Sequence, residues 1–297
     1  MIDNFRAGTL TRYGLDIDAV MEANPGLIYC AISGFGRDGA MSHRSGMDLI
    51  AQAASGLVSL NVDETGRPAK IPMAVADIPT GLYAVIGVLA ALAARQKTGR
   101  GQKLDLSLLE SLLSLMPVET SSYLATGANP QPYARRGSRN AAPYQILATK
   151  DGWIAIAGAA QPLWVKLCAI LQCERYLDDP RFSSNASRIA NSVVLEELLE
   201  AELVKRTTAA WLVELDKAGI PASEVLSVSG ILDHQHIADR GLVASPQERP
   251  SASRAVMTPI KFSETSVRFR AAAPDLGAHT QEVRAGALAH EWPALNP

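Results

Sequence analysis

Apolar residues recur with helical and strand periods by turns through the first 126 residues of the chain. The continuous apolar run 27–32 predicts a strand buried on both faces of a parallel sheet. The alternation over 103–108 predicts a half-buried strand, and the run 70–75 predicts an extended segment before a long apolar helix. Shorter helices are predicted at 15–23, 48–55 and 108–116. This alternation indicates an α/β domain.

The pattern changes after residue 126. Segment 127–143 is rich in Gly, Pro, Asn and Arg, which indicates a linker. Beyond it, two apolar runs flank Lys150-Asp151-Gly152, and Asp-Gly between such runs predicts a hairpin. Helices are predicted at 162–171, 186–205 and 208–218, so 144–257 is interpreted as a small α+β domain. From 258 to 297 we expect an extended return, including 260–262, and a polar tail.

Composition excludes several classes of function. The 297 residues carry a net charge of −2 and 47% apolar residues, so neither nucleic acid nor an anionic membrane is an indicated partner. The longest apolar run, 82–94, is shorter than the ~20 residues a bilayer needs, and no signal peptide is recognisable. Three cysteines favour a reducing cytoplasm over a disulfide framework. His234 and His236 lack companion ligands, so no metal site is predicted.

Two glycine- or arginine-rich motifs have competing interpretations. The stretch 34–39 (Gly-Phe-Gly-Arg-Asp-Gly) matches the dinucleotide-binding fingerprint literally, but a polar, glycine-broken segment follows it instead of a helix. We therefore interpret it as a flexible loop over a ligand. The arginine cluster 135–139 is either solvated surface or a contact to a ligand phosphate. No Gly-x-Ser-x-Gly motif supports serine hydrolase chemistry.

Asp77 is the most informative candidate residue. It stands between the extended run 70–75 and the long apolar helix, where free N–H groups and the helix dipole stabilise an anion. On these grounds it is either a helix cap or a nucleophile placed beyond the carboxyl end of a strand, where α/β sheets bind ligands. The residues alone leave both interpretations open.

Several motifs occur in the order in which a known family carries them. They are Asn4-Phe5-Arg6-Ala7-Gly8, Asn24-Pro25-Gly26-Leu27-Ile28-Tyr29, Ser33-Gly34-Phe35-Gly36, Val75-Ala76-Asp77-Ile78-Pro79-Thr80-Gly81, Arg95-Gln96-Lys97-Thr98-Gly99-Arg100-Gly101-Gln102, Asp179-Pro180-Arg181-Phe182, Gly219-Ile220-Pro221 and Pro274-Asp275-Leu276-Gly277-Ala278-His279-Thr280. Together they resemble the family III coenzyme A transferases, the CaiB/BaiF group, from residue 1 to about residue 285.

The resemblance implies a fold and an activity. The fold is a Rossmann-like parallel-sheet large domain formed by both chain ends (1–126 and 258–297), with the small domain 144–257 inserted, in an interlocked cytoplasmic homodimer. The activity is transfer of CoA from an acyl-CoA to a carboxylic acid, with no cofactor besides the CoA thioester substrate. Asp77 would be the covalent nucleophile, and helix-terminal N–H groups would hold the oxyanions. Implied CoA contacts are Asn4, Phe5, Arg6, Arg12, Met47 and Asp48.

The resemblance also leaves two alternatives to an active CoA transferase. Related α-methylacyl-CoA racemases carry a histidine where this chain has Met47, and abstraction of a proton from both faces needs two bases. Met47 therefore favours transfer over racemisation. Family members also begin with strand–helix units that precede the segment matching Met1, and we expect those units to be missing here. The second alternative is accordingly a CoA-binding remnant with impaired catalysis.

Overall fold

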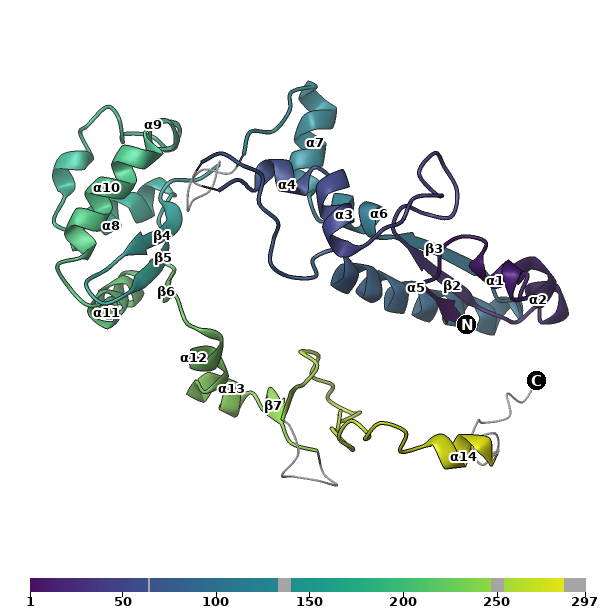
Figure 1. Cartoon of the computed structure of the whole chain (residues 1–297). Helices are drawn as coiled ribbons and strands as arrows, with labels where there is room; N and C mark the ends of the chain where they lie inside the picture. The colour runs from purple at the N-terminus through teal and green to yellow at the C-terminus, as the bar shows by residue number, and fades with distance from the viewer. Residues whose placement is uncertain (64, 133–139, 247–253, 286–297) are drawn as a thin grey trace. The chain divides into compact units, whose positions relative to one another are not determined.

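The computed structural model describes residues 1–63, 65–132, 140–246 and 254–285 (Figure 1). The chain divides into two compact units, Met1–Ser223 and Glu224–Pro297. The arginine cluster at 135–139 lies outside the described residues.

A parallel sheet organises residues 1–126. Its strands are β1 (Ile2–Asp3), β2 (Tyr29–Ser33) and β3 (Lys103–Ser107), with β2 in the middle. Both pairings are parallel, with Ile2 beside Cys30 and Tyr29 beside Lys103. The strands predicted at 27–32 and 103–108 are therefore confirmed within two residues, as is the mixed α/β class.

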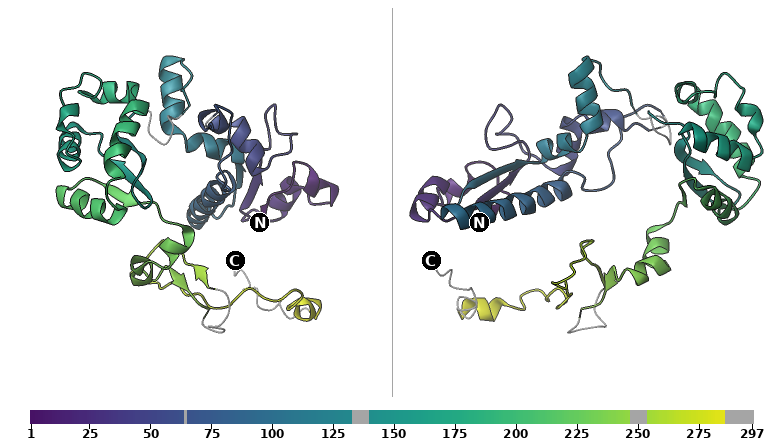
Figure 2. Two further views of the ribbon diagram at one scale, coloured as in Figure 1. Left: turned by 60° about the vertical axis from the view of Figure 1, so that its left-hand side comes forward. Right: turned by 180° about the vertical axis from the view of Figure 1, so that it is seen from behind.

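Helices connect and cover these strands. They are α1 (Thr9–Arg12), α2 (Ile17–Ala23), α3 (Asp48–Ala54), α4 (Leu57–Leu60), α5 (Asp77–Thr98), α6 (Leu108–Ser114) and α7 (Pro117–Thr126). The long helix α5 lies along one face of the sheet (Figures 1 and 2), and Gly87 packs against the Leu104 side chain. Gly99 ends α5 with a left-handed φ of 69°, as its position predicts.

The extended segment expected at 70–75 is not a strand. Residues 70–76 form bends and turns, so Asp77 does not follow a strand of the sheet. Pro72 has no N–H for a ladder, and the backbone groups of Ile71 and Met73 bond to the Gln52 side chain instead. The segment is thus shaped by a buried side chain rather than by strand pairing.

Helix α5 is longer than its apolar sequence run. It has 22 residues, and by length and composition alone it is the one described helix that could cross a membrane. Only 17% of its most apolar window is buried, and Leu82, Val85 and Leu89 are exposed. The expectation of no membrane span rested on the shorter run 82–94, and it stays a prediction. Core helices of soluble proteins meet the same test.

Residues 140–223 build a separate apolar core. Strands β4 (Tyr144–Ala148) and β5 (Trp153–Ala157) form the predicted antiparallel hairpin, and β6 (Ala222–Glu224) extends the sheet. The helical segments are α8 (Gln161–Ile170), η1 (Glu174–Tyr176), α9 (Asn185–Ala190), α10 (Ser192–Leu203) and α11 (Thr208–Ala218). Trp164, Leu195, Leu199 and Leu215 are fully buried between them.

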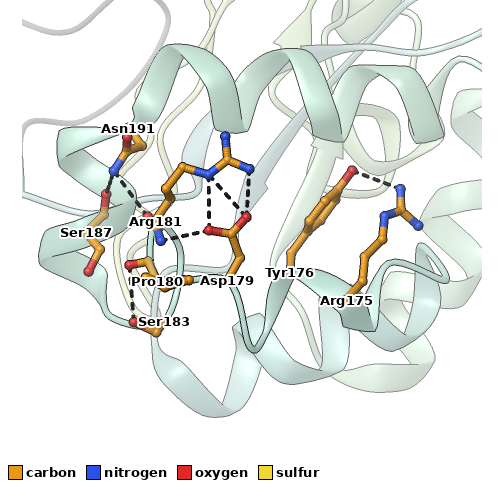
Figure 3. Close-up of polar contacts among 8 residues, drawn as sticks. All are labelled: Arg175, Tyr176, Asp179, Pro180, Arg181, Ser183, Ser187 and Asn191. Atoms are coloured by element: carbon orange, nitrogen blue, oxygen red, sulfur yellow. Dashed lines mark hydrogen bonds and ion pairs between the residues drawn. The ribbon is translucent and has the colours of Figure 1, made fainter.

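The helix predicted at 186–205 is divided at Asn191. The Asn191 Nδ2 donates to the carbonyl of Ser187 at 2.9 Å and to that of Arg181 at 3.4 Å. An asparagine side chain that bonds to the backbone competes with helix continuation. Figure 3 shows this contact beside the Asp179–Arg181 turn, where the Arg181 guanidinium donates to both carboxylate oxygens of Asp179.

The unit Glu224–Pro297 contains short elements. They are α12 (Val228–Leu232), α13 (Gln235–Asp239), the antiparallel pair β7 (Val243–Ala244) and β8 (Ala255–Val256), and α14 (Thr280–Arg284). The extended run expected at 260–262 is not a strand, since β8 ends at Val256. The domain boundaries expected near 127, 144 and 258 stay predictions.

Candidate active site

A cavity of about 610 Å³ opens beside the start of α5. Of the residues that the sequence analysis selects, Asn4, Met47, Asp48 and Asp77 lie on its wall. The other three selected residues, Phe5, Arg6 and Arg12, are exposed and lie outside this wall. The structure thus brings four of the seven together from three separate stretches of sequence.

Asp77 is the first residue of α5, and its carboxylate is accessible to solvent. Partial loss of hydration raises the pKa of Asp77, and the negative charge of Asp48 raises it further. The ionisable side chains on the described cavity wall are Asp48, Lys70 and Asp77. A solvent-accessible carboxylate whose anionic form is destabilised is more reactive as a nucleophile toward a carbonyl carbon.

Asp48 bonds to the helix start that carries Asp77. Its Oδ2 accepts from the N–H of Ala76 at 2.7 Å and from the N–H of Asp77 at 3.3 Å. Residue 79 is a proline and offers no N–H. The expectation that N–H groups of this helix end hold the oxyanions is therefore wrong for Ala76 and Asp77, because Asp48 already occupies both donors.

Met47 precedes α3 with extended backbone, and its side chain is 72% exposed. It lies on the same cavity wall as Asp77. A thioether neither gives nor takes a proton at neutral pH, so position 47 supplies no second base.

The glycine-rich loop after β2 is tied at several points. The Ser33 hydroxyl accepts from the N–H of Gly36 at 2.9 Å, and Asp105 accepts from the N–H of Arg37 at 2.9 Å. The Arg37 guanidinium pairs with Asp3 at 2.6 Å, and Asp3 also accepts from the N–H of Phe5 at 3.0 Å. The motif therefore anchors the loop to the segment that contains Asn4 and Phe5.

Buried Asp3 also receives the Tyr29 hydroxyl. Burial and this hydrogen bond raise the pKa of Tyr29 to about 12. Asp3, Tyr29 and Arg37 thereby connect strands β1 and β2 to the glycine-rich loop.

A family model described as CoA-transferase family III matches residues 1–280. The chain belongs to this family.

Relatives of the family III chain match it over nearly its whole length. Succinate–glutarate CoA-transferase of Agrobacterium fabrum is 33% identical, over 96% of this chain and 71% of the relative. Succinyl-CoA:mesaconate CoA-transferase of Haloarcula marismortui is 33% identical, over 95% of this chain and 72% of the relative. The crystal structure of a CaiB/BaiF family protein from Brucella suis matches with a TM-score of 0.83 at 35% identity, covering 96% of this chain and 74% of that one.

These findings confirm the resemblance and make the protein a CoA transferase of family III. Sequence reasoning missed Lys70 and the buried Gln52, both of which line the cavity; Gln52 is 1% exposed. The available signal was a glutamine four residues after Asp48 in an otherwise apolar helix, on the same face. Among the described residues, no cluster of His, Cys, Asp and Glu forms a candidate metal site.

Proposed function

We propose that this family III chain transfers CoA from an acyl-CoA donor to a carboxylic acid through covalent intermediates on Asp77. The observation that carries the proposal is the accessible Asp77 carboxylate, with a raised pKa, on the wall of a cavity of about 610 Å³. Asn4, Phe5, Arg6, Arg12 and Met47 are proposed to contact CoA, which is a substrate here and not a resident cofactor.

The reaction consists of four acyl exchanges without a change of oxidation state. A carboxylate oxygen of Asp77 attacks the thioester carbonyl, the C–S bond breaks, and its electron pair leaves on the CoA thiolate. The thiolate attacks the Asp77 carbonyl of the resulting anhydride and releases the donor acid. The acceptor carboxylate then displaces the thiolate from the aspartyl thioester, and the thiolate takes the acceptor acyl group from Asp77. Covalent catalysis divides the transfer into steps of similar energy.

We propose dicarboxylic acids as the substrate class. The two named relatives act on succinate, glutarate and mesaconate, each of which carries a second carboxylate. Lys70 supports the proposal because it is the cationic side chain on the described cavity wall, and an ammonium group stabilises a remote carboxylate. The assay therefore pairs succinyl-CoA with glutarate or mesaconate.

We also propose a homodimer in the cytoplasm. The exposed apolar side chains Leu82, Val85 and Leu89 of α5 support association, and Cys30, Cys168 and Cys173 are buried and unpaired, which suits a reducing compartment. Light scattering coupled to gel filtration checks the dimer, and fractionation of cells that express the tagged protein checks the compartment.

Hydroxylamine trapping tests the chemistry. Incubation with succinyl-CoA and hydroxylamine should convert Asp77 to a hydroxamate detected by peptide mass spectrometry, and Asp77→Ala should abolish transfer. Asp178→Asn is the control, because Asp178 is exposed and lies in the separate core of 140–223. Normal transfer by Asp77→Ala contradicts the mechanism. Binding of CoA without any exchange favours the impaired remnant, and deuterium uptake at the acyl α-carbon favours a racemase.

A further inference from the structure

The start of α5 is capped by a side chain from another helix. Its N-cap residue, Ala76, has no side chain that can accept a hydrogen bond, yet its N–H and that of Asp77 both reach Asp48 Oδ2. Helix starts leave such donors unsatisfied unless a local cap or another group takes them. Asp48 lies on α3, 29 residues earlier, so the cap is tertiary and depends on how α3 is placed.

Gln52 stands one turn after Asp48 on α3 and fixes the segment before Asp77. Its Oε1 accepts from the N–H of Ile71 at 2.9 Å. Its Nε2 donates to Asp48 Oδ1 at 2.5 Å, to the carbonyl of Ile71 at 3.2 Å and to that of Met73 at 3.3 Å. Because Nε2 faces oxygen acceptors and Oε1 faces an N–H donor, this buried amide fits in a single orientation.

Gln52 and Asp48, one turn apart on α3, therefore hydrogen-bond to the two ends of the segment from Ile71 to Asp77. We propose that Asp48 and Gln52 are positioning residues for the Asp77 nucleophile, holding the segment so that its carboxylate stays on the cavity wall. This inference rests on the proposed function of Asp77. It also changes the role expected for Asp48, since both of its carboxylate oxygens bond within the protein.

The charge of Asp48 adds a second effect to its hydrogen bonds. Asp48 and Lys70 are the ionisable side chains that share the described cavity wall with Asp77. The resting site holds two carboxylates close together, whereas the anhydride and thioester of Asp77 are neutral. The repulsion between the Asp48 and Asp77 carboxylates is thus present before Asp77 is acylated and absent afterwards. Its loss favours attack of Asp77 on the thioester.

The test compares Asp48→Asn, Asp48→Ala and Gln52→Leu in the full chain with the control Asp178→Asn. Asp48→Ala and Gln52→Leu are expected to lower kcat by about 100-fold, as misplacement of a reacting group does, with the KM for succinyl-CoA changed less than about threefold. Asp48→Asn keeps an oxygen for the cap but removes the charge. Its acid limb of kcat against pH should move to lower pH, a shift that a purely structural role does not produce.

A titration independent of turnover completes the test. With 13C-labelled aspartate, the NMR pKa of Asp77 should fall in Asp48→Asn and stay unchanged in Asp178→Asn. A higher KM with unchanged kcat would show that Asp48 contacts CoA directly, and an unchanged Asp77 pKa would overturn the charge effect. If wild type forms the Asp77 adduct and the Asp48 and Gln52 variants have the same kcat as wild type, the positioning role is overturned while the proposed function stands. If wild type forms no adduct, the proposed function fails, and the NMR result still decides the coupling.

Discussion

Gly34 and Gly46 are in direct backbone contact on the wall of the candidate site's cavity. A Cβ on Gly34 would lie 2.9 Å from the nitrogen of Gly46 and overlap its Cα, and a Cβ on Gly46 would overlap the Cα of Gly34. Both residues line the cavity that contains Asp77. The glycine at 34 therefore closes the loop 34–46 at its base, which explains a glycine-rich motif that has no dinucleotide-binding helix after it.

Gly46→Ala is expected to destabilise the protein by about 1–3 kcal/mol, because backbone must move to admit the methyl group. Gly81→Ala is the matched control, since its Cβ would meet nothing within 4 Å and it lies inside α5. Alanine in a helix interior gains about 0.5–1 kcal/mol over glycine. Urea unfolding of both variants measures the difference, and equal stability of Gly46→Ala and wild type would contradict the close backbone contact.

Arg188 is a fully buried cation surrounded by neutral oxygens. Its guanidinium donates to the carbonyls of Ala142 at 2.6 Å, Ala159 at 2.7 Å and Phe182 at 3.0 Å, and its carbon lies 5.2 Å from the Trp164 ring centroid. Burial lowers the pKa of Arg188. The planar fork joins three chain segments that are distant in sequence.

Arg188→Lys is therefore expected to cost about 3 kcal/mol, because an ammonium group leaves buried carbonyls unsatisfied. Arg181→Lys is the control, since its ion pair with Asp179 is open to solvent, which screens its contribution to stability (Figure 3). Chemical unfolding followed by tryptophan fluorescence reports the loss. A cost for Arg188→Lys no larger than that for Arg181→Lys would show that the fork is dispensable.

Local patterns predicted most elements of the sheet and the hairpin, because strand and helix periods there agree with burial. They failed where a distant side chain determines the backbone. The carbonyls of Ile71 and Met73 are oriented by hydrogen bonds from the Gln52 side chain. Asn191 interrupts a continuous helical pattern by donating to the Ser187 carbonyl. For the site, Asp77 and its helix could be found from sequence. The cap that Asp48 provides could not be found from sequence, because the spacing between Asp48 and Asp77 does not indicate which backbone N–H groups the Asp48 carboxylate bonds.

Asp151 connects the β4–β5 hairpin to α11. It accepts from the N–H of Thr208 at 2.8 Å and from its hydroxyl at 3.0 Å. These bonds lower the pKa of Asp151 below its ordinary value of 3.8. A depressed pKa contributes stability that is present above 3.8 and is lost as pH falls through the folded value.

Asp151→Asn is accordingly expected to have a lower Tm than wild type at pH 7, with the gap narrowing below pH 4 as the wild-type carboxylate is protonated. Asp178→Asn removes the same charge from an exposed position and should show no such trend. Differential scanning fluorimetry from pH 7 to pH 3 measures both variants. A gap that is constant over this range would contradict the charge-dependent contribution.

Asp77→Asn should behave in the opposite way, because the pKa of Asp77 is raised above 3.8. Between the unfolded and folded pKa values the native state binds more protons than the unfolded state, so wild-type stability falls as pH rises through that interval. Above it the wild type retains the full cost of ionising Asp77 beside Asp48, a cost that asparagine removes. Asp77→Asn is therefore expected to have a higher Tm than wild type at pH 7 and an equal Tm below pH 4, while losing the nucleophile and with it CoA transfer. A Tm below that of wild type at pH 7 would show that Asp77 stabilises the fold as a cap and is not a strained nucleophile.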